Sequence, residues 1–168
     1  MNIRAATPSD ALALATIYNY YVRETIVTFE EEPVSVEIFS RRIEDVLASA
    51  LPWLVAFEDQ TAVGYAYATP WKPRRGYRFS VEVTVYVADG YAGRSIGSAL
   101  YAELFQLLEA RGVHAAMGGI ALPNDASMAL HEKFGMRKVA HFEQVGFKFG
   151  RWIDVGYWER IFAATGVC

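Results

Sequence analysis

The sequence contains a single cysteine, which is the last of its 168 residues. A disulfide framework, a cysteine metal cluster and a buried thiol nucleophile are therefore excluded as explanations of its function. Long hydrophobic runs are also missing, since no stretch approaches the roughly 18 consecutive apolar residues of a membrane span. The first residues lack the charged and then apolar build of a signal peptide. We expect a cytoplasmic protein that binds no membrane and no metal.

An excess of positive charge is absent too. Lys and Arg number 16 against 19 for Asp and Glu, which gives a formal net charge of −3. A general nucleic-acid binder needs a basic face, so we expect no nucleic-acid partner, and any anion site must be local. At 53% hydrophobic residues the chain is long enough for one well-packed core. We predict a single domain over residues 1–168.

Apolar residues recur with two spacings, which predict alternating strands and helices. Alternating, aromatic-rich runs predict strands at residues 3–6, 53–57, 62–69, 79–87, 113–120, 137–147 and 152–159. Spacings of three and four, with capping residues, predict helices near residues 8–22, 35–47, 97–111 and 124–134. The inward face of the second helix is expected to carry Ile38, Ile43, Val46 and Leu47. This mixed order indicates an α/β fold with a partly antiparallel sheet.

The junction over residues 85–100 is the most informative local pattern. A valine-rich strand enters a turn containing Gly93 and Gly97, and a long helix follows. Unpaired backbone N–H groups and the helix dipole meet at such a point, which suits a pyrophosphate. The lysine of a P-loop and the glycine fingerprint of a dinucleotide fold are both missing. A plain strand-to-helix connector explains the glycines equally well.

The same junction resembles the GNAT family of N-acetyltransferases. The family motif has Arg or Gln, two residues, a glycine, one residue, and then Gly or Ala; residues 92–97 align with it. Ala92 and Ser95 depart from the pattern. Backbone amides survive both changes, whereas the side-chain contact to phosphate does not, and Arg94 is expected to replace it.

A wider resemblance points to one branch, the phosphinothricin and methionine sulfoximine acetyltransferases. The matching segments cover nearly the whole chain, at residues 17–19, 28–30, 71–74, 77, 81–82, 84–87, 122–125, 131–132, 135 and 146–152. The resemblance implies a three-layer fold with a mixed, mostly antiparallel sheet flanked by helices. It also implies direct transfer of acetyl from acetyl-CoA to the α-amine of a small amino acid or analogue.

This chemistry requires a proton acceptor, because an amine attacks only when it is neutral and an α-ammonium is mostly protonated at pH 7. Glu82 is our candidate general base, since it lies mid-strand on the polar face of residues 79–87. Its alternative role is a structural carboxylate that positions the ammonium or pairs with an arginine. His131 lies near the position where much of the family has a tyrosine that acts as general acid toward the leaving thiolate. The alternative is that His131 is an ordinary surface residue.

The resemblance also implies the cofactor site. The Val85 N–H is the expected donor to the developing oxyanion, and residues 85–87 are expected to pair with the pantetheine arm. Asn124 is expected to contact the pantetheine amides as well as to cap a helix. The full cofactor-binding set is Val85, Tyr86, Val87, Gly93, Arg94, Ser95, Ile96, Gly97, Ser98 and Asn124.

The loop over residues 72–78 is the candidate substrate clamp, because a guanidinium binds a carboxylate or phosphinate through two parallel hydrogen bonds. A solvated basic loop that balances the acidic residues 30–32 is the alternative. With the positions implied by resemblance, the substrate-binding set is Phe29, Glu30, Lys72, Pro73, Arg74, Tyr77, Glu82, Val83, Thr84 and Lys148.

The aromatic segment around residues 146–149 implies, by resemblance, a homodimer in which this segment borders the partner's active site. Two other functions stay open. One is a family member acting on another amine, such as a polyamine, an amino sugar or a protein N-terminus. The other is a non-catalytic acyl-CoA-binding module, which would have no need of a base at Glu82.

Overall fold

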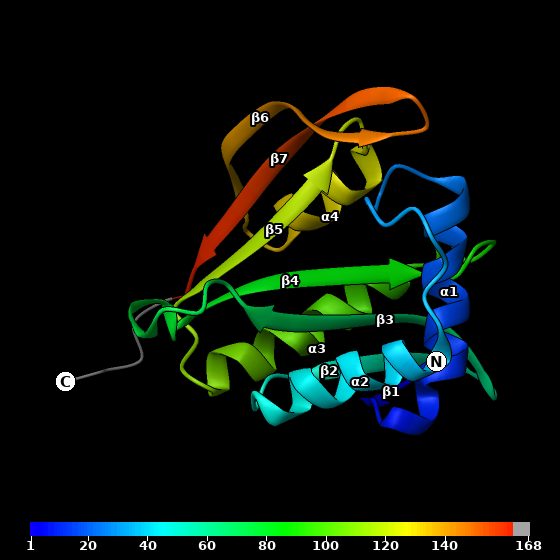
Figure 1. Ribbon diagram of the computed structural model, residues 1–168. Coiled ribbons are helices and arrows are strands. Elements are labelled where there is room, and N and C mark those ends of the chain that lie inside the picture. Colours follow the sequence, from blue (N-terminus) through cyan, green and yellow to red (C-terminus); the bar gives the residue numbers. More distant parts are fainter. Residues whose placement is uncertain (163–168) are drawn as a thin grey trace.

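The computed structural model describes residues 1–162 of the chain. Strands and helices alternate, and Figure 1 shows them as one sheet covered by helices. The strands are β1 (Asn2–Ala5), β2 (Trp53–Glu58), β3 (Thr61–Pro70), β4 (Ser80–Val87), β5 (Ala115–Ala121), β6 (Arg137–Lys148) and β7 (Arg151–Ile161). The helices are α1 (Ala11–Glu24), α2 (Val36–Ala48), α3 (Ile96–Ala110) and α4 (Asp125–Lys133), with short 3₁₀ turns at Pro8–Asp10 and Arg75–Tyr77.

The sheet has seven strands in the order β1-β2-β3-β4-β5-β7-β6. Among the strands of residues 1–162, β4 and β5 form the one parallel pair, and every other neighbouring pair is antiparallel. The helix α3 supplies the crossover that a parallel connection requires. The predicted fold class, α/β with a mixed and mostly antiparallel sheet, is confirmed.

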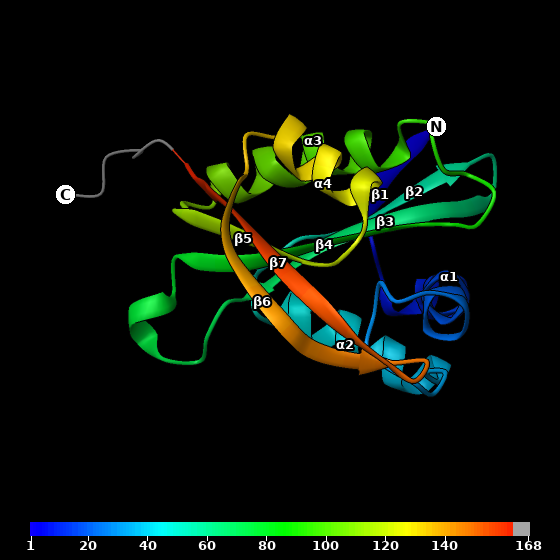
Figure 2. The same cartoon turned by 90° about the horizontal axis from the view of Figure 1, so that it is seen from above.

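Helices cover both faces of the sheet, which gives the three layers implied by the resemblance (Figure 2). One buried cluster joins α3 to the sheet, and a second joins α1 and α2 to the opposite face. The second cluster is rich in stacked rings, with Trp53 and Tyr67 only 4.1 Å apart between centroids. Such packing on both faces fixes the direction of β4, the strand that carries the candidate base.

The predicted inward face of α2 is partly wrong. Ile43 and Val46 are buried as expected, whereas Ile38 is 42% exposed and Leu47 is 38% exposed. Phe39 takes the inward position and is 2% exposed. Spacings of four and three from Phe39 through Ile43 to Val46 form a single stripe along the helix, and this stripe faces the sheet. The predicted cap is confirmed, because Ser35 accepts a hydrogen bond from the Ile38 N–H.

The strands β4 and β5 pair over only three positions and then separate. Their register runs from Ser80 opposite Ala115 to Glu82 opposite Met117. Beyond that point β5 turns away and stays paired with β7, while β4 stays paired with β3. Figure 1 shows the resulting wedge, which is open toward the carboxyl ends of both strands. Glu82 lies at the apex of this opening.

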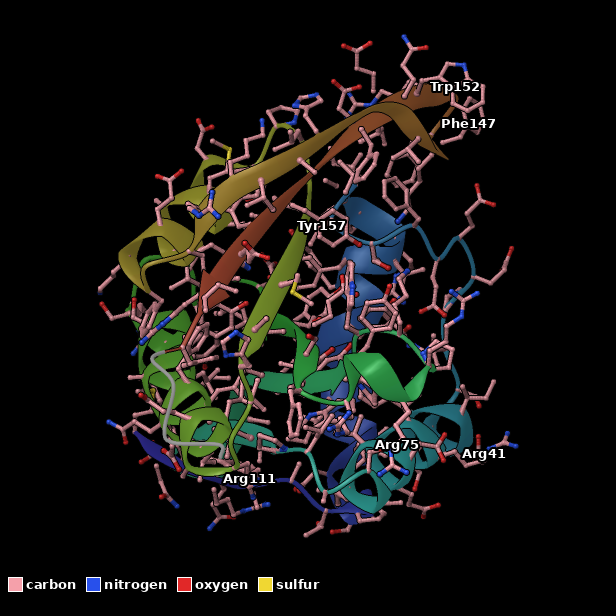
Figure 3. The ribbon with its side chains drawn as sticks, turned by 90° about the vertical axis from the view of Figure 1, so that its left-hand side faces the viewer. Arg41, Arg75, Arg111, Phe147, Trp152 and Tyr157 are labelled. Carbon is pink, nitrogen blue, oxygen red and sulfur yellow. The ribbon has the colours of Figure 1, made fainter. Side chains whose placement is uncertain are left out.

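The strands β6 and β7 form a long hairpin that leaves the body of the protein (Figures 1 and 2). The register of β6 is irregular between Phe142 and Gly146, where Gln144 has φ of 52°. Phe147 and Trp152 lie at the hairpin tip (Figure 3), and they are 49% and 63% exposed. The outermost strand of the sheet therefore ends in an exposed aromatic surface.

Within residues 1–162 no helix is both long enough and apolar enough to cross a membrane. The same residues contain no cluster of His, Cys, Asp and Glu side chains suited to a metal ion. The single cysteine, Cys168, lies outside the described residues.

Candidate functional site

A groove of about 470 Å³ lies where β4 leads into α3, and we call it the turn groove. Gly93 has φ of 77° and Ser95, the N-cap of α3, has φ of 60°, so the chain turns sharply through left-handed positions. The first N–H groups of α3 lack intrahelical acceptors and lie at this groove, as an anion site requires. The lining is Tyr21, Val27, Val85, Val87, Tyr91, Ala92, Gly93, Ser95, Ile96, Gly97, Ser98, Asn124, Ala126, Ser127, Ala129, Leu130 and Lys133.

Gly97 keeps the turn groove open at the start of α3. A Cβ atom at this position would lie 3.2 Å from Leu130 Cδ2 and 3.8 Å from Val85 Cγ2, so α3, α4 and β4 meet closely here. A side chain would fill the space between them. The small residues at 92, 93 and 97 therefore leave an open cradle at the start of α3, and the pyrophosphate site stays a prediction.

The side chain of Arg94 points elsewhere. Its guanidinium forms an ion pair with Glu58 at 2.8 Å and lies over the Tyr91 ring, and it is not part of the groove lining. Lys133 of α4 lines the groove instead, with its Nζ atom 3.1 Å from Ser98 Oγ. The cation that lines the turn groove is therefore Lys133, whereas the sequence analysis expected Arg94.

The backbone of β4 beyond Glu82 has an unpaired edge. The Ala88 N–H donates to the Val63 carbonyl at 2.9 Å, and antiparallel pairing alternates from residue to residue. The N–H groups of Val85 and Val87 consequently face away from β3, toward the wedge from which β5 has departed. The Tyr21 hydroxyl donates to the Val87 carbonyl at 2.6 Å. Val85 thus presents its N–H to the opening, as the predicted oxyanion donor must.

A small cavity of about 50 Å³ lies inside the wedge, and we call it the wedge cavity. It adjoins the turn groove, because Val27, Val85, Asn124 and Ser127 line both. Its full lining is Val27, Val83, Thr84, Val85, Tyr86, Tyr101, Gly119, Ile120, Ala121, Asn124, Ser127 and His131. The predicted residues Val83, Thr84, Tyr86 and Asn124 are therefore brought together with His131.

Asn124 also performs its expected capping role at α4. Its side-chain oxygen accepts a hydrogen bond from the Ser127 N–H at 3.1 Å. Its amide nitrogen is not used by this bond, so capping leaves a donor for a ligand in either adjoining hollow.

His131 is a core histidine with 3% exposure rather than a surface residue. Its Nδ1 atom lies 2.7 Å from the Ser127 carbonyl, which only an N–H can bond, so Nδ1 carries the proton. Its Nε2 atom then accepts from the Tyr101 hydroxyl at 3.1 Å. Burial lowers the pKa of His131, which favours this neutral form. Both ring nitrogens are occupied, so the geometry favours a positioning role over release of a proton.

Glu82 is half-buried at the apex of the wedge. One carboxylate oxygen, Oε1, accepts a hydrogen bond from the Tyr157 hydroxyl at 3.3 Å. Burial raises the pKa of Glu82, and this rise is opposed by the Tyr157 hydrogen bond and by the charge of Lys72. No arginine pairs with Glu82 within residues 1–162, so the structural ion pair weighed as its alternative role is not formed. A partly desolvated carboxylate of this kind is suited to accept a proton.

A third hollow of about 760 Å³ lies beneath the β6–β7 hairpin, and we call it the hairpin pocket. Its walls are mostly apolar, with Lys72, Tyr157 and Glu159 as the polar exceptions. The lining is Phe29, Trp71, Lys72, Met117, Val139, Ala140, Phe142, Val145, Gly146, Phe147, Val155, Tyr157 and Glu159. Tyr157 connects this pocket with Glu82.

The predicted substrate residues Phe29 and Glu30 have different positions. The Phe29 ring packs on Gly146 so closely that a Cβ atom there would lie 2.2 Å from two ring carbons, and it lines the hairpin pocket. The Glu30 carboxylate is bonded by the Arg42 guanidinium, with Nη1 at 3.0 Å. This bond lowers the pKa of Glu30. Phe29 therefore forms part of a wall, and Glu30 is engaged in an ion pair.

Lys148 is buried at 1% exposure. Its ammonium donates to the Thr28 carbonyl at 2.7 Å and to the Tyr21 carbonyl at 3.4 Å. Lys148 thus fastens the end of β6 to the segment that follows α1. Lys148, which the sequence analysis placed in the substrate-binding set, lines none of the three hollows described here.

The basic loop after β3 is divided between the site and the solvent. Lys72 lines the hairpin pocket. Pro73 and Arg74 are exposed, Tyr77 is 42% exposed, and none of the three lines a hollow described above. Figure 3 shows Arg75 of the same loop at the end of the molecule away from the hairpin tip. Of the predicted clamp, the structure brings Lys72 alone to the site.

Sequence reasoning missed four residues that shape the site: Tyr21, Tyr101, Lys133 and Tyr157. Lys133 carried a usable signal, because a cation in the last turn of a helix that borders an anion groove is a natural candidate. The three tyrosines carried none, since each acts on a residue at least 30 positions away in the chain.

Residues 3–156 match the family model described as the acetyltransferase (GNAT) domain. A curated phosphinothricin N-acetyltransferase from Streptomyces coelicolor is 42% identical, and the alignment covers 95% of each chain. This similarity, with the family match, confirms the resemblance found in the sequence.

Two solved structures have the same fold over almost the whole chain. A phosphinothricin acetyltransferase from Sinorhizobium meliloti in complex with acetyl-CoA is 31% identical, with a TM-score of 0.92 over 95% of this chain and 87% of its own. A ribosomal-protein-alanine N-acetyltransferase from Brucella melitensis is 39% identical, with a TM-score of 0.94 over 96% and 100%.

Proposed function

Because this chain belongs to the GNAT acetyltransferase family and uses acetyl-CoA as co-substrate, we propose that it acetylates the α-amine of a small amino acid or analogue, with Glu82 as general base. One observation carries this proposal. A half-buried carboxylate that forms no ion pair with any residue of 1–162 lies at the apex of the wedge, on the same strand as the Val85 N–H that faces the opening. A module that only bound acyl-CoA would have no use for a carboxylate held there.

The turn groove and the wedge would hold acetyl-CoA through residues of this chain. We assign the pyrophosphate to the amides of residues 93–98 and to Lys133, and the pantetheine arm to the edge of β4 and to Asn124. When bound, acetyl-CoA supplies a thioester carbonyl as the electrophile. The Val85 N–H is placed to donate to the carbonyl oxygen as negative charge develops on it.

The acceptor amine would lie between Glu82 and Val85. A strand rises about 3.3 Å per residue, so these two positions are about 10 Å apart along β4. This distance accommodates the Glu82 side chain, the amine and, where needed, one water between them. Glu82 takes the proton that the ammonium must lose, and its raised pKa strengthens it as an acceptor. His131 and Tyr101 orient the back wall of the wedge cavity.

Replacing Glu82 tests this assignment. Glu82→Gln keeps the shape of the side chain and removes the base, so kcat/KM for the amine should fall by about 10²- to 10⁴-fold. The acid limb of its pH profile should disappear as well. Glu109→Gln, on the exposed surface of α3, is the matched control and should behave as the wild type. A Glu82→Gln variant with an unchanged rate and pH profile would remove Glu82 from this role.

The hairpin pocket would receive the side chain of the acceptor. We infer this from its place beside Glu82, through Tyr157, and from its apolar walls and single lysine. An acceptor with a carboxylate or phosphinate for Lys72 and a short apolar chain fits this lining. The curated Streptomyces relative, whose name specifies phosphinothricin, supports the same class of acceptor.

Thiol release from acetyl-CoA should distinguish the candidate acceptors. The panel is phosphinothricin, methionine sulfoximine, methionine sulfone, spermidine, glucosamine and a peptide with an N-terminal alanine. The peptide is included because the Brucella structure is described as a ribosomal-protein-alanine enzyme. We expect turnover with the amino-acid analogues, and turnover with the peptide alone would replace this acceptor class by protein N-termini.

We further propose that the chain forms a homodimer through the hairpin. Between residues 142 and 152 of the hairpin, five apolar side chains are between 48% and 63% exposed: Phe142, Val145, Phe147, Phe149 and Trp152. They lie on or beside β6, the edge strand of the sheet. Such an edge favours association with another chain. Light scattering at micromolar concentration should give the mass of a dimer. A monomer under these conditions would contradict the proposal.

A further inference from the structure

Tyr157 reaches Glu82 across an intervening strand. Tyr157 belongs to β7 and Glu82 to β4, and β5 lies between them. The contact forms because β5 carries a glycine at the crossing point, where Gly119 is the register partner of Tyr157. A Cβ atom at Gly119 would lie 3.0 Å from Tyr157 Cζ, 3.2 Å from its hydroxyl and 3.2 Å from Glu82 Oε1. The absence of a side chain at this position therefore lets the two groups meet.

The Tyr157 ring packs against two other aromatic rings. It packs edge-on against Trp71, with centroids 5.5 Å apart, and edge-on against Phe142 at 6.0 Å. Figure 3 shows Tyr157 on the inner side of the hairpin, well away from the tip residues Phe147 and Trp152. A ring fixed in this way presents its hydroxyl in one direction, toward Glu82.

We propose that Tyr157 is the positioning residue of the reaction: its hydroxyl holds Glu82 Oε1 so that the other carboxylate oxygen faces the acceptor amine. This inference rests on the proposed role of Glu82 as base. Within residues 1–162, the second oxygen, Oε2, accepts no hydrogen bond, so it is free for the amine or for a bridging water. The hydroxyl stabilises the ionised form of Glu82 and offsets part of its burial.

Several other titratable groups face the same carboxylate. Lys72 comes from the loop after β3 and favours the ionised form of Glu82. Burial chiefly raises the pKa of Tyr67 on β3, and the charge of Glu82 adds to this rise. Glu159, two residues beyond Tyr157 on β7, lines the same pocket and pairs with Arg137. The strand β5 contains no titratable side chain. Among these neighbours within residues 1–162, Tyr157 is the one whose side chain donates a hydrogen bond to Glu82.

The substitution Tyr157→Phe keeps the ring and removes only the hydroxyl. Losing a hydrogen bond to the ionised carboxylate should move the acid limb of the kcat/KM profile to higher pH by about 0.5–1 unit. We expect kcat with methionine sulfone to fall by about 3- to 10-fold at pH 7, because the remaining carboxylate is less well oriented. The KM for acetyl-CoA should not change, since Tyr157 does not line the turn groove.

A second readout is independent of turnover. NMR of carbon-labelled glutamate carboxyl groups, with the Glu82 signal assigned by its loss in Glu82→Gln, should show a higher pKa for Glu82 in Tyr157→Phe than in the wild type. Tyr157→Leu removes the ring and the hydroxyl together. If Tyr157 acted through packing alone, Tyr157→Leu would lose stability, and Tyr157→Phe would match the wild type in both the kcat/KM profile and the Glu82 titration.

The outcomes separate the two proposals. An identical Glu82 titration in wild type and Tyr157→Phe overturns the positioning role and leaves Glu82 as base untouched. Wild-type activity in Glu82→Gln overturns the base itself, and the positioning role is lost with it. A shift of both the profile and the titration in Tyr157→Phe, with the thermal unfolding midpoint unchanged, supports both.

Discussion

The buried ammonium of Lys148 offers a direct test of how the hairpin is attached. The Lys148 ammonium donates hydrogen bonds to two backbone carbonyls, and within residues 1–162 only one of these carbonyls has other donors. The Tyr21 carbonyl also accepts from the Thr25 N–H and hydroxyl. The Thr28 carbonyl belongs to a buried residue, and Lys148 lies 2.7 Å from it. In Lys148→Met, a side chain of similar length, we therefore expect the Thr28 carbonyl to lose its partner.

The expected loss follows from that one bond. A hydrogen bond to a charged group contributes about 1.5–3 kcal/mol, and leaving a buried acceptor without a partner costs a similar amount. Burial lowers the pKa of Lys148, which shows that desolvation of the ammonium offsets part of this gain. A net loss of about 1–3 kcal/mol would lower the thermal midpoint of a chain this size by about 2–12 °C.

The assay is thermal unfolding of Lys148→Met beside Lys138→Met, an exposed lysine on the same strand that should change stability by about 0.5 kcal/mol at most. Steady-state kinetics with methionine sulfone should accompany it. A Lys148→Met variant with an unchanged midpoint and a strongly raised KM for the amino acid would refute the anchoring role, and would restore Lys148 as a substrate ligand.

Two further predictions concern separate parts of the molecule. Lys133→Ala should raise the KM for acetyl-CoA by about 5- to 50-fold with little change in kcat, because the proposed charged contact to phosphate is lost. Lys138→Ala is the control and should keep the wild-type KM. A wild-type KM in Lys133→Ala would contradict the phosphate contact. Asp10 accepts hydrogen bonds from Arg4 and from the Thr7 N–H, and these bonds lower its pKa in the folded state. Its contribution to stability is therefore present above the ordinary pKa of Asp and is lost as pH falls through the depressed value. Asp10→Asn should lower the free energy of unfolding by about 0.5–2 kcal/mol at pH 7. In urea titrations this difference from the wild type should shrink toward pH 2. A difference that does not change with pH would count against this account.

Local patterns predicted those features that depend on neighbours in sequence. The alternation of residues 79–87 placed Glu82 on the polar face of β4, and Ser35 correctly marked the start of α2. The glycine turn before α3 was likewise found where the groove lies. Each of these follows from backbone geometry over a few residues, which the sequence specifies directly.

The site contacts that were missed depend on strand register and on side-chain partners far apart in the chain. Arg42 of α2 engages Glu30, and Glu58 at the end of β2 engages Arg94. Nothing in the local spacing indicates that either charge is already paired. The meeting of Tyr157 with Glu82 requires the β5–β7 register, which is fixed only when the sheet is assembled.

The early end of the β4–β5 pairing has a consequence for how such a protein can diversify. The turn groove and the hairpin pocket share no lining residue. One is built from α1, β4, α3 and α4, and the other chiefly from the β6–β7 hairpin. Under the proposed assignment of acceptor and donor, mutations that remodel the hairpin would change which acceptor is bound and leave the donor site unaltered. The wedge thus lies between two hollows whose linings can change independently.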